Sequence, residues 1–132
     1  MKIKKFIMVG ILALIFSIPT VAFAYTKAFS FTFKTSMKTD LFYLEPRGGF
    51  VYVENTATTF GGKPDSKLYY VDIFAEDGWG AAKRENTLTF PRSGTSKQAG
   101  LVSSKAYKKY SLTFRKSADG ATVDGYGRAY DR

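Results

Sequence analysis

The chain has 132 residues, no histidine and no cysteine, and carries twenty basic against eleven acidic side chains, a net charge of +9. The missing residue types exclude Ser-His-Asp and Cys-His nucleophilic sites, zinc and blue-copper sites of the usual kinds, and haem ligated by His or Cys. They also exclude disulfide bonds, so packing alone must stabilise the fold.

The amino terminus has the three zones of a bacterial secretory signal peptide. Lysines within the first five residues precede FIMVGILALIF (residues 6–16), an apolar stretch too short to span a membrane. The small side chains of Ala22 and Ala24 predict cleavage after Ala24. We therefore expect residues 1–24 to be a helical signal peptide and Tyr25 to begin a protein that is secreted or loosely held at the envelope. An uncleaved amino-terminal anchor is the alternative.

The remainder, residues 25–132, is long enough for one domain with a single core. Apolar residues alternate with polar ones along most of it, and no long stretch repeats with helical spacing, which predicts strands with one buried face. The residues predicted to point inward are Phe29, Phe31 and Phe33; Leu88 and Phe90; and Tyr110, Leu112 and Phe114. In two other strands the pattern gives opposing faces without deciding which is buried: Val51, Val53 and Ala57 against Phe50, Tyr52 and Glu54, and Tyr69, Val71, Ile73 and Ala75 against Leu68, Tyr70, Asp72 and Phe74.

Three segments have less regular patterns. LFYLE (residues 41–45) is a short apolar run that ends at a turn, and SGTSKQAGLVSS (residues 93–104) fits either a loop or an edge strand. KLYYVDIFAED (residues 67–77) is apolar on both faces over much of its length, as expected of a central strand.

The last predicted strand has one face of small side chains. Along this face the order is Val123, Gly125, Gly127 and Ala129. Glycine weakens a strand, so its recurrence indicates a bulge or a large ring lying across the backbone. The candidate rings are Tyr110 and Phe114. We interpret the row as structural rather than as a ligand site.

Turn signals separate seven or eight short strands at intervals of about 8–12 residues, which predicts an all-β antiparallel sandwich of immunoglobulin-like or jelly-roll type. The lysine-rich leader, the lack of cysteine and the closing segment YSLTFRKSADGATVDGYG resemble small exported β-domain proteins of Gram-positive bacteria. This resemblance implies no activity.

Positive charge is concentrated in the second half of the mature chain. Residues 25–78 carry six basic and seven acidic side chains, whereas residues 79–132 carry eleven and four. Basic residues interleaved with aromatic rings are suited to binding a polyanion. For an exported protein, the expected polyanion is an anionic cell-wall polymer or a membrane surface rather than nucleic acid. The candidate binding residues are Arg92, Lys97, Lys105, Lys108, Lys109, Arg115, Lys116 and Arg128. A solvated surface without a partner is the alternative for the run from Lys105 to Lys109.

We expect no enzymatic activity and no cofactor. A glycosidase would need two carboxylates about 5–9.5 Å apart, for which Asp72 with Glu76, or Asp72 with Glu54, is the candidate pair. The acidic turns lack the spacing of a calcium loop. The alternative function is that of a secreted cationic antimicrobial or toxin-like protein, which would act on membranes with exposed rings such as Trp79.

Overall fold

A computed structural model describes residues 25–76, 81–103 and 109–131. These residues form nine strands and no helix. The strands are β1 (Thr26–Phe33), β2 (Ser36–Lys38), β3 (Phe42–Tyr43), β4 (Phe50–Phe60), β5 (Leu68–Glu76), β6 (Ala82–Pro91), β7 (Gly94–Leu101), β8 (Lys109–Arg115) and β9 (Thr122–Tyr130). The prediction of an all-β chain is confirmed for this part, whereas the predicted signal helix lies outside the described residues.

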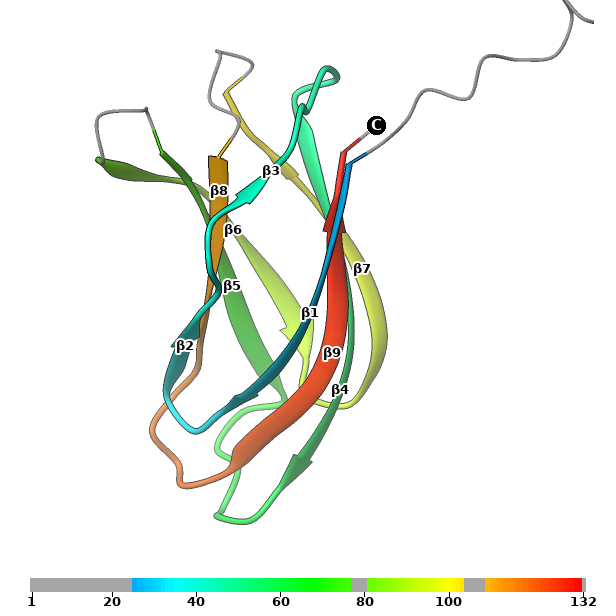
Figure 1. The fold of residues 1–132 in the computed structure, drawn as a ribbon. Coiled ribbons are helices and arrows are strands. Elements are labelled where there is room, and N and C mark those ends of the chain that lie inside the picture. The colour runs from blue at the N-terminus through cyan, green and yellow to red at the C-terminus, as the bar shows by residue number, and fades with distance from the viewer. Residues whose placement is uncertain (1–24, 77–80, 104–108, 132) are drawn as a thin grey trace, which may run out of the picture.

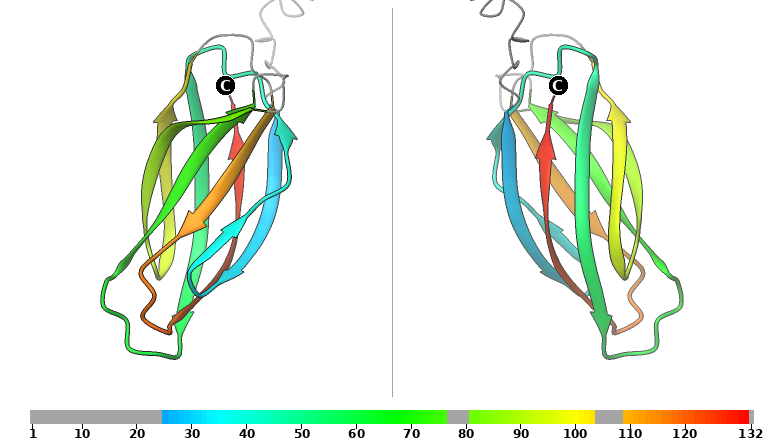
Figure 2. Two further views of the ribbon diagram at one scale, coloured as in Figure 1. Left: turned by 90° about the vertical axis from the view of Figure 1, so that its left-hand side faces the viewer. Right: turned by 90° about the vertical axis from the view of Figure 1, so that its right-hand side faces the viewer.

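The strands form two antiparallel sheets that face each other (Figure 1). Sheet A has the strand order β1-β9-β4-β7, and sheet B has the order β2-β8-β5-β6, with β3 also paired to β8. Figure 2 shows sheet B in front in its left view and sheet A in front in its right view. The segment of residues 93–104, which fits either a loop or an edge strand by its sequence, contains β7, an edge strand of sheet A.

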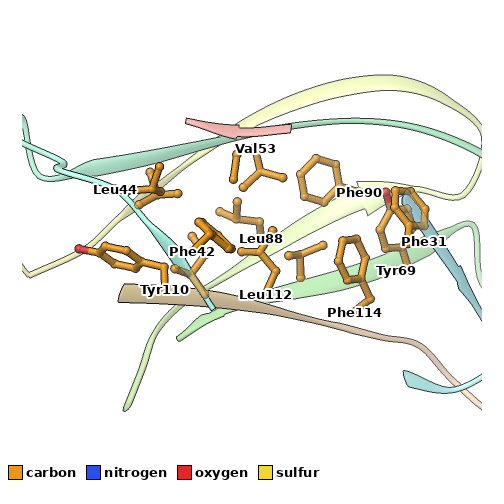
Figure 3. Close-up of a cluster of buried hydrophobic side chains, with 14 of the residues drawn as sticks. Phe31, Phe42, Leu44, Val53, Tyr69, Leu88, Phe90, Tyr110, Leu112 and Phe114 are labelled. Atoms are coloured by element: carbon orange, nitrogen blue, oxygen red, sulfur yellow. The ribbon is translucent and has the colours of Figure 1, made fainter. Parts of the chain in front are cut away.

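The core lies between the sheets. The residues predicted to point inward belong to the core cluster or, as for Phe29, pack against it. In β4 and β5, where the pattern left the buried face open, the structure buries the face of Val51 and the face of Tyr69. Phe31 of sheet A stacks on Phe114 of sheet B with ring centroids 4.7 Å apart, and Figure 3 shows Phe31 beside Tyr69. Aromatic contacts of this kind between the layers add to the apolar area removed from water, which compensates for the lack of disulfides.

The small residues of β9 make room for side chains of both neighbouring strands. A Cβ on Gly125 would lie 2.1 Å from the carbonyl oxygen of Thr56 and 2.8 Å from the ring of Phe31. The expectation that a ring lies over this row is confirmed, but the ring is Phe31 on the adjacent strand β1. Tyr110 and Phe114, the residues predicted, lie on β8 in the opposite sheet.

The core also contains a polar pair that the pattern did not reveal. Asn55 of β4 is buried, and its Nδ2 donates a hydrogen bond of 3.1 Å to the hydroxyl of Tyr69 on β5. This bond joins the two sheets directly. Burial raises the pKa of the Tyr69 hydroxyl, which therefore stays neutral.

Candidate anion-binding face

The structure does not gather the candidate basic residues into one surface. Arg92 and Lys116 are buried at one end of the sheets, Lys97 and Arg128 lie on the outer face of sheet A, and Lys109 and Arg115 lie on the outer face of sheet B. Lys105 and Lys108 lie outside the described residues, as does Trp79.

Arg92 and Lys116 bind the carboxylate of Asp119. The Arg92 guanidinium is 2.6 Å from Asp119 Oδ2, and Lys116 Nζ is 2.7 Å from Asp119 Oδ1. All three side chains are less than 5% exposed. Hydrogen bonds from Arg92 and then Lys116 hold the pKa of Asp119 well below its usual range. We call these three residues the Asp119 cluster.

The Asp119 cluster joins three loops at the end of the sheets opposite the start of β1 and the end of β9 (Figure 1). Arg92 Nε donates to the carbonyl oxygen of Leu68 at 2.8 Å, and the backbone N–H of Asp65 donates to Asp119 at 3.1 Å. Because both cations are buried and paired, neither can contact a polymer. Their place in the predicted binding set is therefore wrong.

Asp72 is held in a second ion pair, on the outer face of sheet B. Its carboxylate accepts hydrogen bonds from Arg115 Nε at 2.8 Å and from the Thr87 hydroxyl at 2.6 Å. Burial acts to raise the pKa of Asp72, but the bonds from Arg115 and Thr87 and the charges of Arg115 and Arg84 outweigh it and keep the pKa below its usual range. An acid held ionised and covered in this way suits a structural role across β6, β5 and β8.

The geometry does not bring the proposed catalytic carboxylates together. Glu54 lies on the outer face of sheet A, whereas Asp72 lies on the outer face of sheet B, so the core separates them. Asp72 and Glu76 share a face but are four residues apart on β5, about 13 Å at the usual rise per residue. Both separations exceed the distance that a glycosidase pair needs.

A groove opens between the edge strands β1 and β2, with a volume of about 240 Å³. Among the residues that line it, Asp40 is the single carboxylate, and Lys27 and Lys38 are the two cations. The groove therefore offers no second acid for general acid-base chemistry. Its lining is Lys27, Ala28, Phe29, Ser30, Met37, Lys38, Thr39 and Asp40.

The outer face of sheet A is electrically balanced. Lys97 and Arg128 lie in the same cross-strand row as Glu54, and Arg128 Nε is 3.5 Å from the Glu54 carboxylate. Lys97 Nζ sits 5.5 Å from the ring centroid of Tyr130, a cation-π distance. Asp124, also on this face, brings its charge to zero.

The outer face of sheet B is basic. Four cations lie on this face: Lys38, Arg84, Lys109 and Arg115. Each is paired across the strands with a residue that alternates with the buried residues of the core, and these partners are, in the same order, Thr113, Phe74, Glu76 and Tyr70. Lys38, Arg84 and Lys109 form no ion pair within the described ranges, and the acids of this face are Asp72, which is covered, and the half-buried Glu76. We call these four cations the basic face.

Lys38 and Arg84 were missing from the predicted set. Lys38 lies in the acidic half of the chain, and Arg84 precedes a bulge in the pairing of β5 with β6 that shifts the register between Ile73 and Phe74. Strict alternation along the strand would have placed Arg84 on the core side, because it does not allow for Glu85, the extra residue of the bulge. Only the pairing of β2 with β8 could reveal that Lys38 joins Lys109 and Arg115.

Comparisons with known proteins reveal no matching family, no similar curated protein and no similar solved structure. Nor do the described residues contain a helix able to cross a membrane.

Proposed function

We propose that the protein is an exported, non-enzymatic β-sandwich that binds anionic polymer of the cell envelope through the basic face. The observation that carries the proposal is the difference between the two outer faces. The sheet A face balances Lys97 and Arg128 against Glu54 and Asp124, whereas the sheet B face presents four cations over one covered and one half-buried acid.

The layout of the basic face suits a chain-like ligand. Lys109 and Arg115 stand six residues apart on β8, which corresponds to about 20 Å along the strand. Lys38 and Arg84 flank that line from strands on either side. A polymer with a repeating phosphate or carboxylate can meet several of these cations at once, so that weak single contacts add.

The strand order supports assigning the sandwich to the jelly-roll type. β1 pairs with β9, β2 with β8, β4 with β7 and β5 with β6, which is the pattern of one long hairpin rolled into two sheets. Jelly rolls occur in lectin domains, among many other settings, but the fold alone does not specify a ligand.

The test is sedimentation of the mature protein with isolated teichoic-acid-rich cell walls. Replacing Lys38, Arg84 and Lys109 by Gln should weaken binding on the order of 100-fold at low salt, since a Lys or Arg near an anionic surface contributes about 1 kcal/mol. The matched control replaces Lys34, Lys63 and Lys67, which are exposed and lie outside the strands, and should bind within about threefold of the parent.

Two results would count against the basic face. One is equal weakening by the two triple variants, which would indicate an effect of net charge alone. The other is binding that persists undiminished at 1 M salt, where the Debye length is about 3 Å.

A cationic membrane-active protein is the second candidate, favoured by an exposed apolar cross-strand pair. Phe50 of β4 and Leu101 of β7 lie opposite each other and are each at least 40% exposed, as is Leu41, which precedes β3. Exposed apolar side chains that lie together commonly mark a contact surface. Leakage of vesicles rich in anionic lipid, lost when Leu101 and Phe50 become Ser, would favour this function. Intact vesicles at micromolar protein would exclude it.

A further inference from the structure

The carboxylate of Asp131 is buried at the end of β9, with the residue only 2% exposed. Its Oδ1 accepts a hydrogen bond of 2.8 Å from the backbone nitrogen of Tyr25, and its Oδ2 accepts one from the backbone nitrogen of Glu45. No Lys or Arg of the described ranges forms an ion pair with it. Among the residues that the structure describes, Asp131 is thus a buried carboxylate bound by backbone N–H groups alone.

Such an arrangement is costly while both donors are neutral. Removing a carboxylate from water is offset fully only when hydrogen bonds and an opposite charge compensate it. The two other buried carboxylates, Asp72 and Asp119, each have a cationic partner. Asp131 differs from both, because no Lys or Arg in the described part of the chain pairs with it.

The nitrogen that faces Asp131 is the one that export is expected to release. Hydrolysis of the Ala24–Tyr25 peptide bond adds the hydroxyl of water to the Ala24 carbonyl carbon and its proton to the Tyr25 nitrogen. The new amine takes up a further proton from solvent at neutral pH, because an α-amino group has a pKa near 7.7–8.0. The neutral peptide N–H thereby becomes an ammonium.

We propose that removal of the leader creates a partly buried ion pair between the α-ammonium of Tyr25 and the carboxylate of Asp131, so that processing locks the mature fold. The inference rests on the predicted cleavage site and is independent of polymer binding.

The surrounding contacts hold the nitrogen in place. The Asp131 N–H donates to the Tyr25 carbonyl oxygen at 3.2 Å, and the Tyr25 ring contacts the Tyr43 ring edge-on at 4.9 Å. From Thr26 opposite Tyr130, β1 and β9 pair without interruption, and Figure 1 shows the two ends side by side. The ammonium would therefore be formed in position and lose little freedom on pairing.

The ion pair would close the molecule where its first and last strands meet. β1 is an edge strand whose partner in sheet A is β9. Through the Glu45 backbone, the same carboxylate also fixes the segment between β3 and β4. One charge released by processing therefore stabilises three segments at this end.

The experiment compares two chains released from fusions by a protease that leaves no extra residue. One begins at Tyr25 and the other at Ala24, and both contain every residue of the two sheets and the core. The chain that begins at Tyr25 should have a folding equilibrium constant about tenfold larger, because a charge-assisted hydrogen bond is roughly twice as strong as a neutral one.

Two further samples make the result specific. Acetylation of the Tyr25 α-amino group should lower the folding equilibrium constant as much as the extra Ala24 does, without altering any side chain. In Asp131→Asn, the folding equilibrium constants of the chains that begin at Tyr25 and at Ala24 should differ by less than twofold. If that variant fails to fold, the acetylated sample still decides the question.

Equal midpoints in urea for the Tyr25, Ala24 and acetylated chains would overturn the proposal. So would a mass for the exported protein that corresponds to any first residue other than Tyr25. The proposal would be supported if the exported protein begins at Tyr25 and its α-amino group is protected from chemical modification by the ion pair.

Discussion

The guanidinium of Arg92 and the carboxylate of Asp119 lie 2.6 Å apart, with the two side chains only 4% and 3% exposed. In a chain without cysteine, this ion pair connects the end of β6 to the loop between β8 and β9. Two residues from distant parts of the sequence thus form one buried unit with Lys116. Their role is to hold the loops together rather than to meet a ligand.

Replacing Arg92 by Met should strongly destabilise the fold. The change leaves the Leu68 carbonyl oxygen without its donor and Asp119 with a single cation, and removing one partner of a buried pair costs about 3–5 kcal/mol. Urea unfolding followed by circular dichroism measures the loss. Arg84→Met on β6, the strand that ends just before Arg92, is the control and should change the free energy of unfolding by about 0.5 kcal/mol or less, since Arg84 is exposed. Similar losses for both variants would contradict a structural role specific to Arg92.

Acid should unfold the protein through its paired carboxylates. The pKa values of Asp119 and Asp72 are lowered in the folded state, so their contribution to stability is complete above the ordinary carboxyl pKa of about 3.9 and is lost as the pH falls below it. Thermal unfolding at pH 6, 4, 3 and 2 should show a decline that begins near pH 4. Asp119→Asn should be less stable at pH 6 and decline less steeply. An identical decline in parent and variant would show that Asp119 does not contribute.

Alkali should act through Tyr110. Burial, followed by the negative charges of Glu85 and Asp131, raises the pKa of Tyr110 to about 12. Because the unfolded tyrosine ionises near pH 10, the stability that the neutral form contributes is complete below pH 10 and lost as the pH rises toward 12. The stability of Tyr110→Phe relative to the parent should therefore improve between pH 10 and pH 12. A constant difference over this range would contradict the prediction.

Gly125 should not tolerate a methyl group. A Cβ there would lie 2.1 Å from the Thr56 carbonyl oxygen, a backbone atom that cannot move without disturbing the pairing of β4 with β9. Gly125→Ala should destabilise the fold by about 1–3 kcal/mol, the usual cost of overpacking. Gly48→Ala is the matched control because nothing lies within 4 Å of its added Cβ. Equal midpoints for the two variants in urea would show that β9 can shift to accept the methyl group.

Much of the core could be predicted because alternation has the same meaning in every strand. Phe31, Leu88 and Leu112 are buried as expected, since a period of two places successive side chains on opposite faces. The same alternation contained a further signal. Arg92 continues the inward series of Leu88 and Phe90, and Lys116 continues that of Leu112 and Phe114. Asp131 likewise follows Ala129, so each of these buried charges lies on the core side just beyond a strand end.

The sequence by itself determined that the described chain is all-β and many of the side chains that fill its core, because those properties depend on local alternation and on apolar area. Only the tertiary structure decided which charges remain free. Arg92 and Lys116 meet Asp119, Arg115 covers Asp72, and Lys38 joins the basic face, all through strand pairing and loop contacts between distant segments. A charge in a sequence has no fixed exposure, since its surroundings are formed only when the strands pair.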